Sequence, residues 1–511
     1  MQSGWNAWMT RARIGLVLGP VVFVAILLTE PFALPSEAIV VLASTSWVVI
    51  WWISEAIPIP VTSLLPIVLF PSTGVMTASE ATMPYADSIV FLLLGGFLLA
   101  LAIERWNLHH RFSLLIIAAL GLGARRLVLG FMVATGFLSM WISNTATAMM
   151  MVPIAAGVIV ELTVVAGRRV PPLTRRDIEE PIDDMALTEE LVHSIEQDPS
   201  ELPNTAFGTA LMLGIAFSAS IGGAGTLIGS PPNAVLAGVA ESALDAEIGF
   251  LEWMLVGVPV AIVFMAIAWV ILIITLRPTI DRQPAKQDLI KEQLAALGSL
   301  TTGERRVLLV FTLVVTGWLT RPFLLEPAFP FITDSTIAIA GAILVFLVPV
   351  GNVRMLDWSY TTRVPWGVLL LLGAGFSIAK AFQVSGLDRI LADAIAGLGV
   401  TDLFGLVFIV TVTVILLTNV TSNTATAALF MPIMISLGVA VGLEPLVLMA
   451  AVAFSASFAF MLPVATAPNA IVFGTGYLTI PLMVRVGAWL TLAAIVVITL
   501  ATTFWVPLVW S

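Results

Sequence analysis

The chain has 511 residues, of which 59% are hydrophobic and only 11% are charged. Its mean hydropathy is +1.05, so it lacks the polar surface that a soluble globule of this size requires. The formal net charge is -10 and there is no cysteine. Without cysteine the chain has no disulfide framework and no cysteine-ligated metal. The net negative charge argues against nucleic-acid binding, which needs clustered Lys and Arg. The composition predicts an all-α polytopic membrane protein embedded in a lipid bilayer.

Apolar runs recur from one end of the chain to the other. A run of about 17 to 25 such residues crosses the hydrocarbon core as a helix. The first run follows Arg11 and Arg13, but no small-residue cleavage site comes cleanly after it, so we interpret it as a retained helix. The runs predict about 11 transmembrane helices, near residues 14–29, 38–53, 61–75, 88–104, 205–241, 252–276, 304–320, 334–350, 364–385, 445–476 and 481–508.

Two further apolar stretches, 125–163 and 401–440, contain one polar hexapeptide at their centres. Ser-Asn-Thr-Ala-Thr-Ala occupies residues 143–148 and recurs letter for letter at 422–427, with a proline ten residues after each serine. Irregular backbone is tolerated at membrane depth only against protein or a water-filled cavity. We therefore expect two re-entrant hairpins, each entering and leaving the membrane on one side.

The distribution of basic residues supports this topology. With the N-terminus in the cytoplasm, only Arg321, Lys380 and Arg389 fall outside, and cytoplasmic loops normally carry the excess of Lys and Arg. The C-terminus is then extracytoplasmic. Ten of the 32 acidic residues fall in the one polar segment 167–204, which predicts a solvated cytoplasmic insert.

The second half of the chain repeats the order of the first. Pro-Asn-Ala occurs after each hairpin, at 232–234 and at 468–470, and a short amphipathic stretch precedes each hairpin, at 108–122 and 387–398. Each half contains an odd number of crossings, so consecutive copies form an inverted-topology repeat. The predicted divisions are an N-terminal segment with the first helix (1–37), a first repeat (38–276), a cytoplasmic linker (277–303) and a second repeat (304–508).

The paired motifs have a defined chemistry. Ser, Asn and Thr favour helix starts, and an exposed helix N-terminus attracts an anion through its free amides and dipole. Two facing N-termini can hold a small dianion, although the hairpins have no basic residue near either motif. Carbonyl, hydroxyl and amide oxygens at the same breaks suit Na⁺.

The glycine-rich stretch Gly222-Gly223-Ala224-Gly225 lies in an apolar run without a phosphate-loop lysine. It therefore predicts close helix packing and not a phosphate site.

The two Ser-Asn-Thr motifs, Ser-Pro-Pro-Asn at 230–233 and its counterpart Ala-Thr-Ala-Pro-Asn at 465–469 resemble the divalent anion/sodium symporter family, which carries dicarboxylates, citrate and sulfate. The resemblance covers about residues 14 to 510. It implies a homodimer in which each protomer has a scaffold domain and a mobile transport domain, working by an elevator mechanism. Threonine as the third motif residue in both halves is similar to the carboxylate carriers, whereas Ala467 stands where some relatives have proline.

The resemblance also implies site residues. Two or more Na⁺ ions and no organic cofactor are expected, with a first sodium site at Ser139, Ser143, Asn144 and the Gly229 carbonyl, and a second at Thr418, Ser422, Asn423 and the Ala465 carbonyl. The substrate is expected to contact Asn144, Thr145, Ser230, Asn423, Thr424 and Thr466.

These features favour a secondary carrier of the plasma membrane that imports C4-dicarboxylates such as succinate, malate or fumarate with Na⁺. A Na⁺-independent dicarboxylate exchanger and a citrate or sulfate carrier are alternatives within the same class. An anion channel, with the hairpins as its selectivity element, is an alternative from a different class. An enzyme is not expected, because the apolar part of the sequence has no catalytic dyad and no cofactor loop.

Overall fold

The computed structural model describes residues 2–31, 34–121, 123–163, 206–278, 289–390 and 402–510, and the regular structure in these ranges is almost entirely helical. The acidic insert 167–204 lies outside the described residues, as does most of the amphipathic stretch 387–398. An all-helical fold suits a bilayer, since a helix satisfies its own backbone hydrogen bonds.

The elements form a long series of helices joined by short connections. Short helical segments that are not α-helical carry the label η. The first half comprises α1 (Gln2–Thr29), α2 (Ser36–Ser54), α3 (Ile59–Thr62), α4 (Leu65–Ser72), α5 (Ala78–Thr82), η2 (Met83–Ala86), α6 (Ser88–Arg105), α7 (Leu108–Leu120), α8 (Ala124–Ser139), α9 (Asn144–Thr163), α12 (Ala206–Gly223), α13 (Pro231–Leu244) and α14 (Phe250–Leu276). The second half comprises α15 (Leu289–Ala296), α16 (Thr302–Thr320), η4 (Arg321–Leu325), α17 (Asp334–Leu347), β1 (Pro349–Val350), β2 (Val353–Arg354), η5 (Trp358–Arg363), α18 (Trp366–Ser385), α20 (Leu403–Thr418), α21 (Asn423–Val441), α22 (Pro445–Ser457), η6 (Pro463–Ala465), α23 (Ala467–Gly474), α24 (Ile480–Leu500), η7 (Ala501–Trp505) and α25 (Val506–Val509). The two strands pair antiparallel, with Pro349 opposite Arg354.

Within the described residues, 9 helices are long and apolar enough to cross a membrane. They include most of the predicted crossings. The crossings expected at 61–75, 334–350 and 445–476 are built instead from shorter apolar helices. One long helix, α21, is an arm of the second predicted hairpin, so length alone does not distinguish an arm from a crossing.

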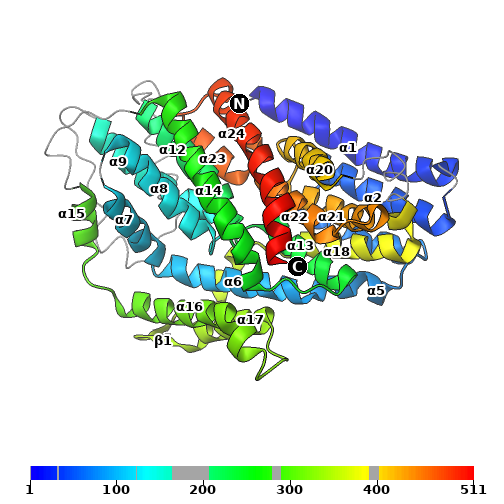
Figure 1. Cartoon of the computed structure of the whole chain (residues 1–511), viewed down its shortest axis with the longest axis horizontal. Coiled ribbons are helices and arrows are strands. Elements are labelled where there is room, and N and C mark those ends of the chain that lie inside the picture. Colours follow the sequence, from blue (N-terminus) through cyan, green and yellow to red (C-terminus); the bar gives the residue numbers. More distant parts are fainter. Residues whose placement is uncertain are drawn as a thin grey trace.

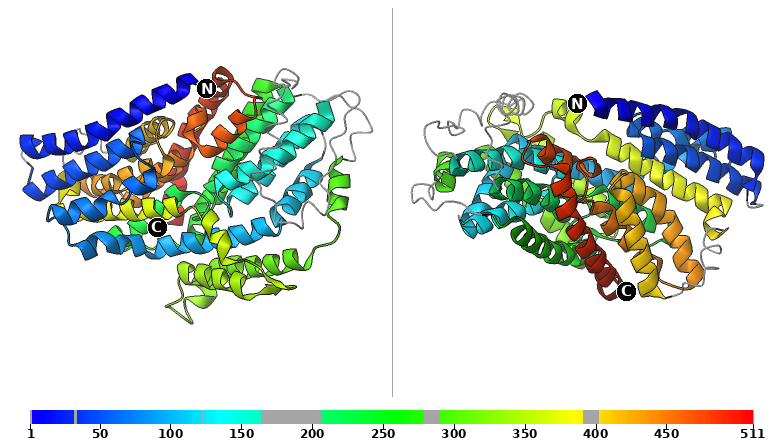
Figure 2. Two further views of the ribbon diagram at one scale, coloured as in Figure 1. Left: turned by 180° about the vertical axis from the view of Figure 1, so that it is seen from behind. Right: turned by 90° about the horizontal axis from the view of Figure 1, so that it is seen from above.

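Both predicted hairpins are helix–turn–helix units. In the first, α8 and α9 pack against each other across the turn 140–143, and in the second, α20 and α21 do so across the turn 419–422. The two hairpins lie toward opposite ends of the long axis of the molecule (Figures 1 and 2). The entry of each hairpin from one side of the membrane stays a prediction.

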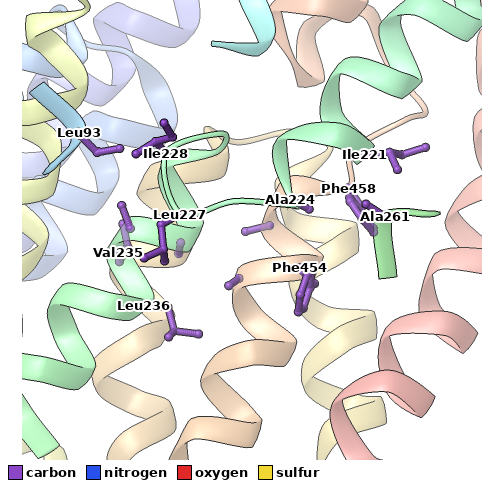
Figure 3. Close-up of a cluster of buried hydrophobic side chains, with 14 of the residues drawn as sticks. Leu93, Ile221, Ala224, Leu227, Ile228, Val235, Leu236, Ala261, Phe454 and Phe458 are labelled. Atoms are coloured by element: carbon purple, nitrogen blue, oxygen red, sulfur yellow. The ribbon is translucent and has the colours of Figure 1, made fainter. Parts of the chain in front are cut away.

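The predicted breaks are present in both downstream helices. A non-helical segment, 224–230, separates α12 from α13, and the segment 458–466, apart from the short turn η6, separates α22 from α23. The first segment runs through a cluster of buried apolar side chains that includes Leu227, 1% exposed, and Ala224, fully buried (Figure 3). Packing against neighbouring helices therefore shields the irregular backbone from lipid.

The halves interlock through these breaks. Helix α13, which follows the first break, packs against α21 of the second hairpin, and α23, which follows the second break, packs against α9 of the first hairpin. Meanwhile α12 packs against α8 and α9, and α22 packs against α20 and α21. Each hairpin is thus bordered by broken helices from both halves.

The glycine-rich end of α12 is a site of close helix packing, as predicted. A Cβ atom placed on Gly222 would overlap the carbonyl oxygen of Gly136 in α8. Small residues at such a contact let two helix backbones approach. The contact brings the end of α12 directly against the first hairpin.

A buried ion pair attaches α7, the helix that precedes the first hairpin, to α16. Arg111 donates from Nε to Glu304 Oε1 at 2.6 Å and from Nη1 to the carbonyl of Gly298 at 2.9 Å. Arg111 is 8% exposed and Glu304 is 5% exposed. Glu304 also accepts the amide of Thr301 at 2.7 Å, which caps the start of α16. The pair fixes the position of α7, against which α8 packs.

Replacing Arg111 with Met should lower the free energy of unfolding by about 3–5 kcal/mol, because Glu304 is left buried without its partner. Combining Arg111→Met with Glu304→Leu should recover most of the loss, since an apolar pair of similar volume fills the same space. Thermal denaturation of the purified protein compares the variants. Equal losses in the single and double variants would contradict the prediction.

Candidate functional site

The two hexapeptides form the first turns of two helices. Helix α9 begins at Asn144 and α21 begins at Asn423, so both hexapeptide serines occupy the position before the helix. Ser143 Oγ accepts the amide of Ala146 at 3.3 Å, whereas Ser422 makes no side-chain cap. The predicted helix starts are therefore present in both halves, and the predicted serine cap in the first.

In the first half, one hydroxyl joins the hairpin to the broken helix beside it. Ser139 Oγ lies 2.7 Å from the carbonyl oxygen of Ala219 in α12 and 2.5 Å from the Asn144 side chain. With the Asn144 amide turned so that its nitrogen faces these groups, it donates to the carbonyls of Gly229 at 3.2 Å and Ala219 at 3.0 Å. With the opposite orientation, the side-chain oxygen of Asn144 faces the carbonyl oxygens of Gly229 and Ala219. Such a cluster of oxygen atoms suits a bound cation.

The second half repeats this arrangement. Thr418 Oγ1 lies 2.7 Å from Asn423 Oδ1 and 2.9 Å from the carbonyl oxygen of Ala456 in α22. Ser139 and Thr418 are both fully buried. Each hydroxyl thus links a hairpin asparagine to a helix carbonyl in the same half of the molecule.

Four oxygen atoms converge at the first break. A Cβ atom placed on Gly229 would lie 2.5 Å from the Gly223 carbonyl oxygen and 2.9 Å from that of Ser139. A Cβ atom placed on Gly223 would overlap Asn144 Oδ1 and lie 2.9 Å from the Gly229 carbonyl oxygen. The site needs glycine at both positions because a side chain would enter the space between these oxygens.

Of the residues expected to contact substrate, four lie in the first turns of α9 and α21, and Ser230 and Thr466 directly precede α13 and α23. Thr145 is half-buried and Thr424 is 7% exposed. Thr466 caps α23 by accepting the amide of Asn469 at 3.2 Å. Ser230 is 1% exposed, and its Oγ lies 3.0 Å from the Oγ of Ser457 at the end of α22. In this arrangement Ser230 bridges the two breaks.

Several residues that take part in the site were not predicted from the sequence. Thr226 Oγ1 donates to the carbonyl of Met140 at the first tip, and Asn419 Oδ1 accepts the amide of Met461 at 3.0 Å at the second. These contacts join each tip to the break beside it. Residues 140 and 419 occupy the same place in the two tips but differ in type, so comparing the repeats could not reveal them.

A basic side chain also reaches the second tip. Arg11 of α1 donates through Nη2 to the carbonyl of Ile53, 2.5 Å away, and lies 3.4 Å from the carbonyl of Val420. The hairpins themselves have no basic residue near their motifs, as the sequence indicated, but the fold supplies this one from the first helix. In the part of the chain that the structure describes, no cluster of three or more His, Asp or Glu side chains could hold a metal ion.

Paired hairpins, paired broken helices and neutral oxygen clusters at their junctions define a polytopic all-helical membrane protein. The family model described as the transmembrane region of sodium:sulfate symporters matches residues 11–511, and the chain belongs to this family. The resemblance to the divalent anion/sodium symporters is thereby confirmed.

The chain is also similar to curated relatives and to a solved structure. The chain is 43% identical over 504 residues to the sodium-dependent dicarboxylate transporter SdcS of Staphylococcus saprophyticus, covering 97% of this chain and 91% of the relative. It is 42% identical over 509 residues to SdcS of Staphylococcus aureus strain MRSA252, covering 98% and 92%. It is 14% identical to the YdaH transporter of Alcanivorax borkumensis, with a TM-score of 0.47 and coverage of 86% and 88% of the two chains.

Replacing Gly229 with Ala should lower the free energy of unfolding by about 1–3 kcal/mol, because the new methyl group overlaps backbone that cannot easily move. Ala465→Gly at the matching place in the second half should cost only about 0.4–1 kcal/mol, since it mainly adds freedom to the unfolded chain. Thermal denaturation of the two variants tests this. A larger loss for Ala465→Gly would show that the first break has room for a side chain.

Proposed function

We propose that this protein is a secondary carrier that imports C4-dicarboxylates together with Na⁺ across the plasma membrane. The observation that carries the proposal is the duplicated cluster of neutral oxygens where each hairpin tip meets a broken helix. The two SdcS relatives are sodium-dependent dicarboxylate transporters by name, and this supports the proposal.

The substrate lies between the first turns of α9 and α21 in this proposal. Asn144, Thr145, Asn423 and Thr424 supply amide and hydroxyl donors there, and Ser230 and Thr466 belong to the two breaks. The free backbone amides at the two helix starts favour negative charge. A dianion with a carboxylate at each end matches two such N-termini better than a compact tetrahedral anion does.

The ions occupy the oxygen clusters on the other side of each tip. Ser139, Ser143, Asn144 and the Gly229 carbonyl form one site, and Thr418, Ser422, Asn423 and the Ala465 carbonyl form the other. Hard oxygen ligands from unwound backbone are the usual way in which such carriers hold Na⁺. Because each hairpin asparagine belongs to an ion site and to the substrate site, bound Na⁺ orients the residue that receives the substrate.

The chain works as a homodimer with a cytoplasmic N-terminus in this proposal. Its two hairpins and broken helices form a transport domain that moves against a scaffold domain. The inward Na⁺ gradient drives import, because empty carrier without Na⁺ binds the dianion poorly. The contact of Arg11 with the Val420 carbonyl joins α1 to the second hairpin of the transport domain, whereas the Arg111–Glu304 pair joins α7 to α16.

Proteoliposomes containing the purified protein should accumulate labelled succinate when Na⁺ is higher outside and should not do so in choline. Uptake without Na⁺ that requires internal dicarboxylate would favour the exchanger, and uptake of citrate or sulfate alone would change the substrate. Single-channel currents would favour the channel. No uptake of any of these anions under any gradient would refute the proposal.

Asn144→Ala and Asn423→Ala should each abolish Na⁺-dependent uptake while the protein still elutes at its folded size, because each removes a side chain shared by an ion and the substrate. Gln383→Ala, in α18 and outside both hairpins and both breaks, is a control that should transport normally. Uptake at the wild-type rate by both asparagine variants would show that the hexapeptides serve the fold alone.

A further inference from the structure

Two buried asparagines outside the expected ion and substrate sites make matching hydrogen bonds across the two helix breaks. Asn233 is the third residue of α13 and Asn469 the third residue of α23, and both are fully buried. Asn233 Nδ2 donates to the carbonyls of Gly223 at 3.0 Å and Thr226 at 2.7 Å. Gly223 is the last residue of α12 and Thr226 lies within the break, so one side chain of α13 is bonded both to the end of α12 and to the segment between the two half-helices.

The second half reproduces the pattern at the same sequence offsets. Asn469 Nδ2 donates to the carbonyls of Ala459 at 3.0 Å and Leu462 at 3.1 Å. These acceptors precede Asn469 by the same intervals at which Gly223 and Thr226 precede Asn233. Repetition of a two-bond contact in both repeats indicates a common role.

Each asparagine holds the turn that presents an expected ion ligand. The carbonyl of Thr226 accepts Asn233 Nδ2 and also the backbone amide of Gly229 at 3.4 Å. Likewise the carbonyl of Leu462 accepts Asn469 Nδ2 and also the backbone amide of Ala465 at 3.2 Å. Gly229 and Ala465 are the two residues whose carbonyls belong to the proposed Na⁺ sites.

The chemistry of the break explains why a side chain performs this task. Carbonyls at the end of a helix, and those in the irregular segment after it, have no intrahelical partner, and they cost free energy when buried without one. Pro232 and Pro468 directly precede the asparagines, and proline has no amide hydrogen to offer. A carboxamide has two donor hydrogens on one nitrogen, so a single asparagine can satisfy two carbonyls at once.

We propose that Asn233 and Asn469 are positioning residues that set the Na⁺ affinity of the two sites by holding the turns that carry the Gly229 and Ala465 carbonyls. The inference rests on the proposed function. Neither asparagine touches the ion or the substrate. Each keeps an oxygen ligand in place before the ion arrives, so that binding Na⁺ does not have to order the break.

Na⁺ titrations of Asn233→Ala and Asn469→Ala test the role, with thermal stabilisation by Na⁺ and Na⁺-dependent succinate uptake as readouts. Each variant should need at least about tenfold more Na⁺ for half-maximal response, which corresponds to about 1.4 kcal/mol. The matched control is Leu236→Ala, one turn further along α13 and equally buried. It should denature at a lower temperature and keep the wild-type Na⁺ dependence.

Asn233→Leu and Asn469→Leu keep the volume of the side chain and remove its donors, and they should show the same shift in Na⁺ dependence if the alanine variants fail to fold. Unchanged Na⁺ dependence in folded asparagine variants would overturn the inference while leaving the carrier function intact. Failure of all four variants to fold would also overturn it, because the amides would then serve folding rather than affinity. Wild-type protein that responds to Na⁺ in neither readout would refute the proposed function itself.

Discussion

Satisfying interrupted backbone inside a membrane is the constraint on which this structure depends. Each half of the chain has two helical interruptions, one at a hairpin tip and one at a break, and lipid offers no partner for exposed amides and carbonyls. The molecule places the interruptions against one another. Ser139 and Thr418 then donate from the tips to the carbonyls of Ala219 and Ala456 in the broken helices.

The same polar groups that stabilise the interruptions make them suited to ions and anions. Carbonyls that end one helix and amides that start another lie within a few residues of each other, so cation ligands and anion ligands alternate along the chain. Interlocking of the halves, with α13 beside the second hairpin and α23 beside the first, brings these groups into one region. Uncharged side chains and backbone groups can therefore bind charged solutes, and no charged side chain has to be buried with them.

The two halves are similar but not equivalent. The first break has Gly223 and Gly229 where the second has Ala459 and Ala465, and the first cannot take a Cβ at either glycine without overlap. The hairpin and its broken helix are thus packed more closely in the first half. Arg11 reaches only the second tip among the contacts that the described residues show. The side-chain hydrogen bonds of Asn233 and Asn469, by contrast, are made at the same sequence offsets in both halves.

The sequence by itself determined the membrane class, the family, the paired hairpins and the positions of the breaks. These follow from local signals: apolar length, the duplicated hexapeptide, and the prolines that prevent a helix from continuing. The two repeats also share a Pro-Asn-Ala segment, but the sequence did not indicate a role for its asparagine. The inverted orientation, the elevator domains and the ion and substrate residues stay predictions.

Only the tertiary structure decided which groups meet. Apolar length did not show that the crossings expected at 61–75, 334–350 and 445–476 consist of shorter helices. Nor could it show that Ser230 meets Ser457, that Arg11 reaches Val420, or that Asn469 reaches back across its break. Such contacts depend on how helices approach one another in space, and residue type and local spacing do not specify that approach.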